Sequence, residues 1–172
     1  MSAIRRLAIR ILGFGAGSSL ALVFAIIFVN SLRRYTVGKS VEWGEELPIY
    51  LTVYGVMFGI GLAYLQDKHV NFTILTDCLP NRFRRRLLVA VDLATVAIGG
   101  VLAWSGTLFA LRRGGIEASG LIGTARTLAE RTGADWLIGL GQMGTWQAAI
   151  GIGGAVLAIA AAIRVSERLQ GR

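Results

Sequence analysis

Residues that bind metals or haem are scarce in this sequence. Its 172 residues include one cysteine, Cys78, one histidine, His69, and two prolines. A lone thiol forms no internal disulfide, and a single histidine rules out haem ligation by two histidines and argues against a zinc site. The sequence also lacks a Gly-rich phosphate loop, and its serines have no evident base partner. We therefore expect no metal, no cofactor and no enzymatic activity.

Four long apolar runs fill most of the chain. Hydrophobic residues make up 54% of it, mean hydropathy is +0.61, and the runs cover residues 11–32, 47–65, 87–111 and 136–163. A helix rises about 1.5 Å per residue and the hydrocarbon core is about 30 Å thick, so each run meets or nearly meets the length needed to cross it. The alternation typical of barrel strands is absent. The sequence predicts an all-α, polytopic membrane protein, with residues 1–172 forming a single domain of four transmembrane helices.

The basic residues flank these runs, so the net charge of +8 indicates a membrane surface as the partner and not nucleic acid. Of the 18 Lys and Arg residues, 11 fall in the two termini and the connector between runs two and three, and the other seven lie in the remaining connectors. The positive-inside rule then predicts that both termini are cytoplasmic. The candidates for contact with anionic lipid headgroups are Arg82, Arg84, Arg85 and Arg86.

The connectors carry further signals. Trp43 precedes the second run and is a candidate interfacial anchor. Glu45 and Glu46 follow it and favour the positive end of the helix dipole. Connector 66–80 is semi-apolar and suits a segment lying in the headgroup plane. Connector 112–135 mixes Ile and Leu with Thr, Arg and Glu, which predicts a short amphipathic helix.

Glycine is abundant inside the runs, at spacings that let helix backbones approach closely. The sequence holds 23 glycines, among them Gly13, Gly17, Gly55, Gly59, Gly151, Gly153 and Gly154. Two interpretations remain open. The glycines indicate a tight bundle or a docking face for another membrane protein, or they reflect the general enrichment of glycine in transmembrane helices.

Asp92 is the one fully charged residue inside the four runs. A buried intramembrane acid is costly and is a functional candidate by default. Arg85 lies seven positions earlier, on the same helical face, so we favour an ion pair or a polar helix contact. The alternative is that Asp92 couples protons in an autonomous, oligomeric small transporter. His69 is interpreted as a headgroup-level polar contact in preference to a titrating switch.

The second run and its flanks resemble the small membrane subunit of tripartite ATP-independent periplasmic (TRAP) transporters, the DctQ-like family. An acidic pair is followed by a Tyr-Leu step, helix glycines, a His-aliphatic pair and a Leu-Pro before a basic stretch. The matching residues are Glu45, Glu46, Tyr50, Gly55, Gly59, His69, Leu79, Pro80 and the Arg82–Arg86 cluster. Pro48 and Tyr54 depart from the pattern, which often has a basic or polar residue and a tryptophan at these positions.

The resemblance implies a scaffold subunit that pairs with a large, elevator-type membrane subunit for sodium-driven uptake of an organic acid. A periplasmic binding protein would deliver the carboxylate substrate. It also implies a bacterial or archaeal cytoplasmic membrane location, and it marks Glu45, Glu46, Tyr50 and His69 as structural or interface positions. The sequence does not name the substrate.

Overall fold

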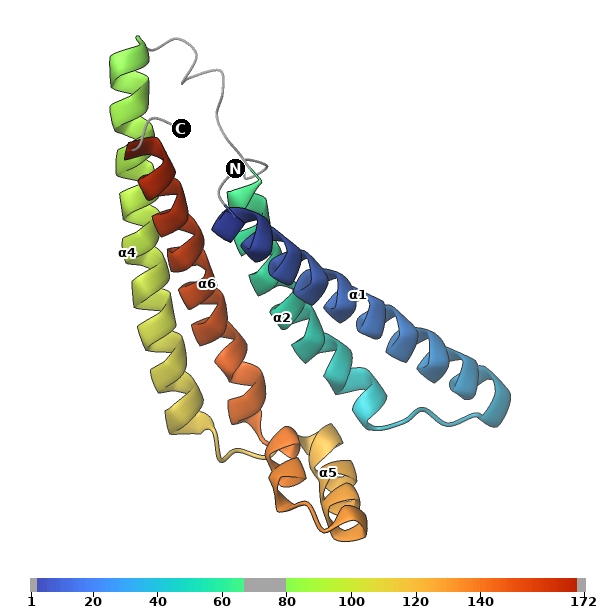
Figure 1. Ribbon diagram of the computed structural model, residues 1–172. Coiled ribbons are helices and arrows are strands. Elements are labelled where there is room, and N and C mark those ends of the chain that lie inside the picture. Colours follow the sequence, from blue (N-terminus) through green and yellow to red (C-terminus); the bar gives the residue numbers. More distant parts are fainter. Residues whose placement is uncertain (1–2, 67–79, 170–172) are drawn as a thin grey trace.

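The computed structural model describes residues 3–66 and 80–169, and within these ranges the chain is helical, as predicted (Figure 1). The elements are α1 (Ala3–Val37), α2 (Trp43–Leu65), α4 (Asn81–Arg113), α5 (Ser119–Thr132), the 3-10 helix η1 (Asp135–Gly141) and α6 (Met143–Leu169). Four of them, α1, α2, α4 and α6, are long and apolar enough to cross a membrane. The prediction of four spans is confirmed, and α5 confirms the short amphipathic helix.

The helix boundaries differ from the apolar runs. α1 and α4 begin earlier than predicted, because both helices continue through the arginines that flank the apolar runs. The predicted start of the fourth span at Trp136 is wrong, because residues 135–141 form η1 and α6 begins at Met143. The break falls at Gln142, whose backbone is extended with φ −105° and ψ 143°.

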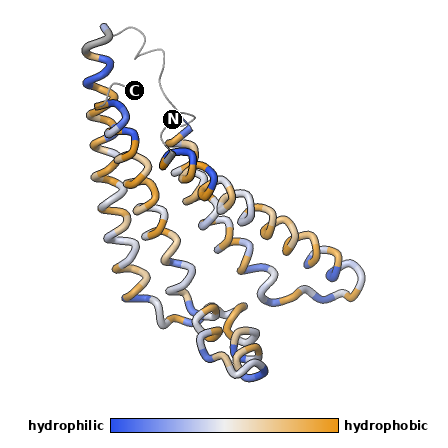
Figure 2. The backbone as a smooth tube through the Cα atoms, viewed as in Figure 1, coloured by the Kyte–Doolittle hydropathy of each residue, from blue (hydrophilic) through white to orange (hydrophobic). Residues whose placement is uncertain are grey.

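The long helices form two antiparallel pairs. α1 packs against α2, α4 packs along α6, and α2 joins the pairs by contacting α6 (Figure 1). The start of α1 and the end of α6 lie at the same end of the bundle, while α5 and η1 lie at the other (Figure 1). α1 and α2 separate toward the connector that joins them. Hydrophobic residues dominate the middle of the long helices and hydrophilic residues gather toward the ends, as expected for membrane spans (Figure 2).

Glycine brings α4 and α6 into close backbone contact. A Cβ at Gly106 would lie 2.5 Å from the Gly151 nitrogen, and one at Gly154 would lie 2.4 Å from the Ala103 nitrogen. No side chain fits at these distances, so the contact requires glycine. The tight-bundle interpretation therefore holds for this pair. It does not extend to Gly17, where a Cβ would meet nothing within 4 Å.

Candidate functional site

Glu46 connects α2 to the start of α5. Its Oε2 accepts a hydrogen bond from the Gly120 backbone N–H at 3.0 Å, and its Oε1 accepts one from the Ser119 hydroxyl at 3.2 Å. These are the first two residues of α5, so the carboxylate satisfies a free N–H and lies at the positive end of that helix dipole. A Cβ at Gly120 would be 3.1 Å from the carboxylate, so the close approach favours glycine there.

Glu45 points to a different neighbour from Glu46. It is exposed, and its Oε1 accepts a hydrogen bond from the Ser40 hydroxyl at 3.2 Å. The same connector is fixed by Asn30 of α1, whose Oδ1 accepts a hydrogen bond from the Val41 backbone N–H at 2.7 Å. Gly44 packs closely on the Asn30 amide, at 2.8 Å from a built Cβ. The acidic pair therefore serves two contacts, one to α5 and one within the α1–α2 connector.

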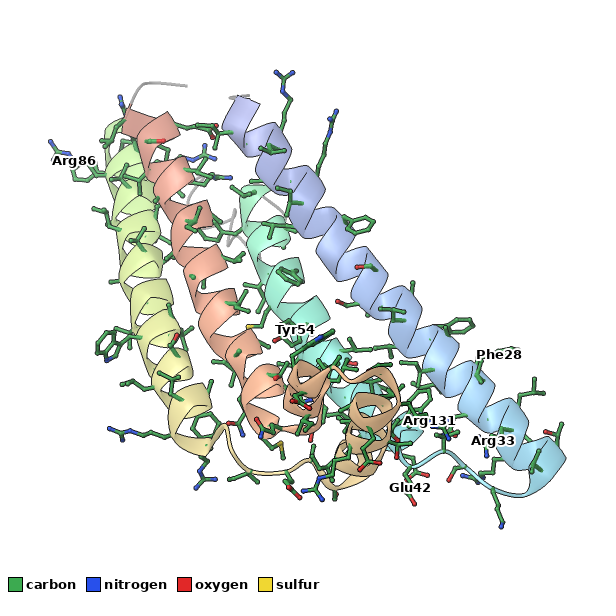
Figure 3. The ribbon with its side chains drawn as sticks, turned by 60° about the horizontal axis from the view of Figure 1, so that its bottom comes forward. Phe28, Arg33, Glu42, Tyr54, Arg86 and Arg131 are labelled. Atoms are coloured by element: carbon green, nitrogen blue, oxygen red, sulfur yellow. The ribbon has the colours of Figure 1, made fainter. Side chains whose placement is uncertain are left out.

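Tyr50 joins α2 to α6 through an aromatic stack. Its ring lies 5.4 Å from that of Trp146, with an interplanar angle of 14°, and its hydroxyl donates to the Met143 sulfur at 3.3 Å. Trp146 in turn donates its indole N–H to the Leu140 carbonyl at 3.0 Å. Tyr54, one turn further along α2 and labelled in Figure 3, donates to the Thr145 carbonyl at 2.5 Å. These contacts set the start of α6 against α2.

The two pattern glycines of α2 differ in their surroundings. Gly55 is buried against α1, where its built Cβ would lie 3.1 Å from the Ser19 Cβ. A Cβ at Gly59 would meet nothing within 4 Å. Gly55 therefore supports the close α1–α2 contact, whereas Gly59 leaves open space beside α2.

Asp92 is 3% exposed and lies in a polar cluster near the end of the bundle that carries the termini. Its Oδ1 accepts a hydrogen bond from the Tyr64 hydroxyl at 2.5 Å, and its Oδ2 lies 2.6 Å from Nε of Arg168. The Nε–H bond is not aligned for a hydrogen bond to Oδ2, so this contact is an ion pair without one. The carboxylate is paired and closed to the bilayer.

Asp92 forms an ion pair and a polar helix contact, as favoured from the sequence, but its cationic partner is not Arg85. Arg85 donates instead to the Arg168 backbone carbonyl at 2.8 Å, and the cation beside Asp92 is Arg168 itself. Helix periodicity identifies neighbours on one helix only, and Arg168 comes from α6. The ion pair therefore connects α4 with α6 across the bundle.

Arg5 and Arg164 extend this cluster to all four long helices. Arg5 of α1 donates to the Leu65 carbonyl at the end of α2, at 2.5 and 3.1 Å, and pairs with Glu167 at 3.4 Å. Arg164 donates to the Tyr64 carbonyl at 3.4 Å, with its guanidinium 6.0 Å from the Tyr64 ring centroid. These arginines satisfy the free carbonyls at the end of α2. Sequence reasoning missed them because it treated terminal arginines only as headgroup contacts.

The remaining candidates lie at the edges of the bundle. Trp43 lines an apolar cavity beside α5. Arg86 is exposed on α4, at the end of the molecule opposite α5 (Figure 3). His69 and the side chain of Arg82 lie outside the described residues. Within the described ranges there is no group of three or more His, Cys, Asp or Glu residues able to hold a metal ion.

Comparison with known proteins places the chain in a family. Residues 23–171 match the family model described as the DctQ component of tripartite ATP-independent periplasmic transporters. The chain belongs to this family. The DctQ proteins are transporter components and not enzymes, which agrees with a multi-pass membrane fold built from four apolar helices.

Relatives with assigned names agree with the family. The chain is 29% identical over 84 residues to the sialic acid TRAP transporter small permease SiaQ of Vibrio cholerae, covering 48% of this chain and 49% of that protein. It is 26% identical over 78 residues to a putative TRAP transporter small permease of Haemophilus influenzae, covering 45% and 47%. A third match, 32% over 69 residues, is to the sialic acid TRAP permease SiaT, covering 40% and 11%. The chain thus spans about half the length, or less, of the curated relatives it matches.

Proposed function

We propose that this DctQ protein is the fixed scaffold subunit of a TRAP-type secondary transporter in the cytoplasmic membrane of a bacterium or archaeon. It pairs with a large, elevator-type membrane subunit that carries the substrate and sodium sites. A periplasmic binding protein delivers an organic acid to that complex. The names of SiaQ and SiaT, both assigned to sialic acid transport, support a carboxylate substrate.

The observation that carries this proposal is the open packing of α1. This helix packs chiefly against α2, and many of its large apolar side chains are exposed, from its first turn to its last. Phe14 is 79% exposed, and Phe28 lies on the outer side of the helix (Figure 3). Toward the connector, α1 and α2 separate around a groove of about 590 Å³ with a mixed polar and apolar lining that includes Asn30 and Arg34. The polar part of this lining favours a protein partner over lipid tails, because tails offer it no hydrogen bonds.

The state of Asp92 supports a scaffold more than an autonomous transporter. A coupling carboxylate must exchange its proton with water during the transport cycle, whereas this one is paired with Arg168 and hydrogen-bonded to Tyr64. Apart from Asp92, the Asp and Glu residues of the described spans lie only among the charged residues at the span ends. The translocation pathway and its ion coupling therefore belong to the large subunit.

Reconstitution into liposomes tests the proposal. We expect no substrate uptake by this chain alone under a sodium gradient, and uptake when the large subunit and the binding protein are added. The large subunit with its binding protein but without this chain should be inactive or strongly impaired. Uptake by this chain alone, abolished by Asp92→Asn in a folded protein, would instead establish the autonomous transporter.

A further inference from the structure

An apolar cavity of about 310 Å³ lies at the end of the bundle that carries α5. Its walls come from the start of α2, from α5 and η1, and from the start of α6. Among the lining residues are Trp43, Leu47, Leu121, Thr124, Leu128 and Trp146. Thr124 and Leu128 are also exposed, so the cavity opens to the surroundings between these α5 side chains. The cavity shares no lining residue with the polar cluster around Asp92, which lies toward the other end of the bundle.

The lining excludes water as the occupant. A bound water needs two to four polar partners, and this cavity is lined almost wholly by apolar side chains. Its depth in the membrane is indicated by Trp43 and Trp146, which lie in the first turns of α2 and α6. Tryptophan is enriched at the boundary between hydrocarbon and headgroups. At that depth the apolar molecules that surround the opening are lipid acyl chains.

A cationic side chain, Arg131, lies about one helical turn beyond the opening along α5. Arg131 follows Thr124 by seven positions and Leu128 by three, so helical spacing places it on the same face of α5, about 4.5 Å further along the axis than Leu128. Figure 3 shows Arg131 at the same end of the molecule as Arg33 and Glu42. Arg126 forms an ion pair with Glu117, whereas Arg131 forms none among the described residues. A guanidinium in this position suits a phosphate group.

We propose that this cavity is a phospholipid site, in which one acyl chain fills the space between α5 and the α2–α6 contact while the lipid phosphate pairs with Arg131. The bound chain would contact Trp43 of α2, Leu128 of α5 and Trp146 of α6 together. It would therefore stabilise the docking of the short helices on the spans. The inference does not depend on the proposed transport role, because it concerns this chain and its own membrane.

Tryptophan quenching by brominated lipid tests the site directly. Trp104 and Trp136 are both 72% exposed and lie outside the cavity lining, so replacing each with Phe leaves Trp43 and Trp146 as reporters. The purified protein in mild detergent is titrated with phosphatidylglycerol brominated on its acyl chains. We expect saturable quenching. Thr124→Phe, which fills the opening from an exposed position, should at least halve it, whereas Gly123→Phe, where a Cβ meets open space on another face of α5, should leave it unchanged.

The headgroup contact has its own test. Arg131→Gln should raise the lipid concentration for half-maximal quenching by about fivefold, as expected for one surface arginine, and Arg126→Gln should not. Equal quenching in Thr124→Phe and Gly123→Phe would overturn the cavity assignment. If Thr124→Phe reduces the quenching but Arg131→Gln does not change the lipid concentration for half-maximal quenching, the phospholipid assignment is overturned. The cavity would then accept any apolar tail, including that of a detergent. If Thr124→Phe does not remain monodisperse, Leu128→Phe narrows the same opening and serves the same comparison.

Discussion

Replacing Glu46 with alanine should release α5 from α2. The change removes both acceptors, one for the Gly120 N–H and one for the Ser119 hydroxyl. Loss of a helix cap costs about 1 kcal/mol and a hydrogen bond to a charged group contributes about 1.5–3 kcal/mol. Since the Ser119 bond is exposed, we expect a total of about 1–2 kcal/mol. That free energy corresponds to a roughly 5–30-fold larger equilibrium population of the state in which α5 is released from the spans.

Hydrogen–deuterium exchange followed by mass spectrometry measures this release. Peptides covering residues 119–132 should exchange roughly 5–30-fold faster in Glu46→Ala, while peptides from α4 and α6 keep their protection. Glu45→Ala is the matched control, because the hydrogen bond described for Glu45 goes to the connector residue Ser40 and not to α5. Glu46→Gln, which keeps an acceptor but removes the charge, should give a smaller effect. Unchanged protection of α5 in Glu46→Ala, or equal effects of the two alanine variants, would show that Glu46 does not hold α5 on α2. If α5 also faces a partner, the same variant should lower complex yield or uptake.

Substitutions at Asp92, Gly106 and Tyr50 test the packing and the polar cluster. Asp92→Asn breaks the ion pair with Arg168 and should destabilise the purified protein by about 3 kcal/mol, which lowers its melting temperature. Uptake by the complete transporter should be retained below that temperature. An unchanged melting temperature with abolished uptake would contradict a structural role for Asp92. Gly106→Ala should separate α4 from α6 at a cost of about 1–3 kcal/mol, because the new Cβ would meet backbone atoms of α6. Gly100→Ala is the control, because its Cβ would meet open space, and it should be neutral or slightly stabilising in the same thermal assay. Tyr50→Phe should be nearly neutral and Tyr50→Ala clearly destabilising, because α6 is held by the ring stack on Trp146 and not by the hydroxyl contact. Equal losses of stability in the two variants would assign the effect to the hydroxyl.

The spans were predictable from sequence because the bilayer imposes one requirement, about 20 apolar residues in a helix, on every spanning segment. The amphipathic pattern of α5 was visible for a similar reason. The start of α6 could not be predicted in this way. Trp136 and its apolar neighbours are hydrophobic whether they form part of a span or a 3-10 helix at its edge. Hydropathy records composition and not the extended backbone at Gln142 that separates the two.

The contacts of the candidate residues were less predictable than the residues themselves. Glu46 and Asp92 stand out in the sequence as an acid at a helix start and an acid inside a span. Their partners, the start of α5 and Arg168, lie far away along the chain and come together only through the packing of α2 on α5 and of α4 on α6. Periodicity within one helix suggested Arg85 for Asp92, and three-dimensional packing replaced it with a residue from another helix.

Isolating the tagged chain from its native membranes tests whether this DctQ protein acts as a scaffold for a larger membrane subunit. A mild-detergent pull-down with mass spectrometry identifies and quantifies what co-purifies. We expect a large polytopic membrane protein in stoichiometric amount. Recovery of this chain alone, as a stable homo-oligomer, would contradict it.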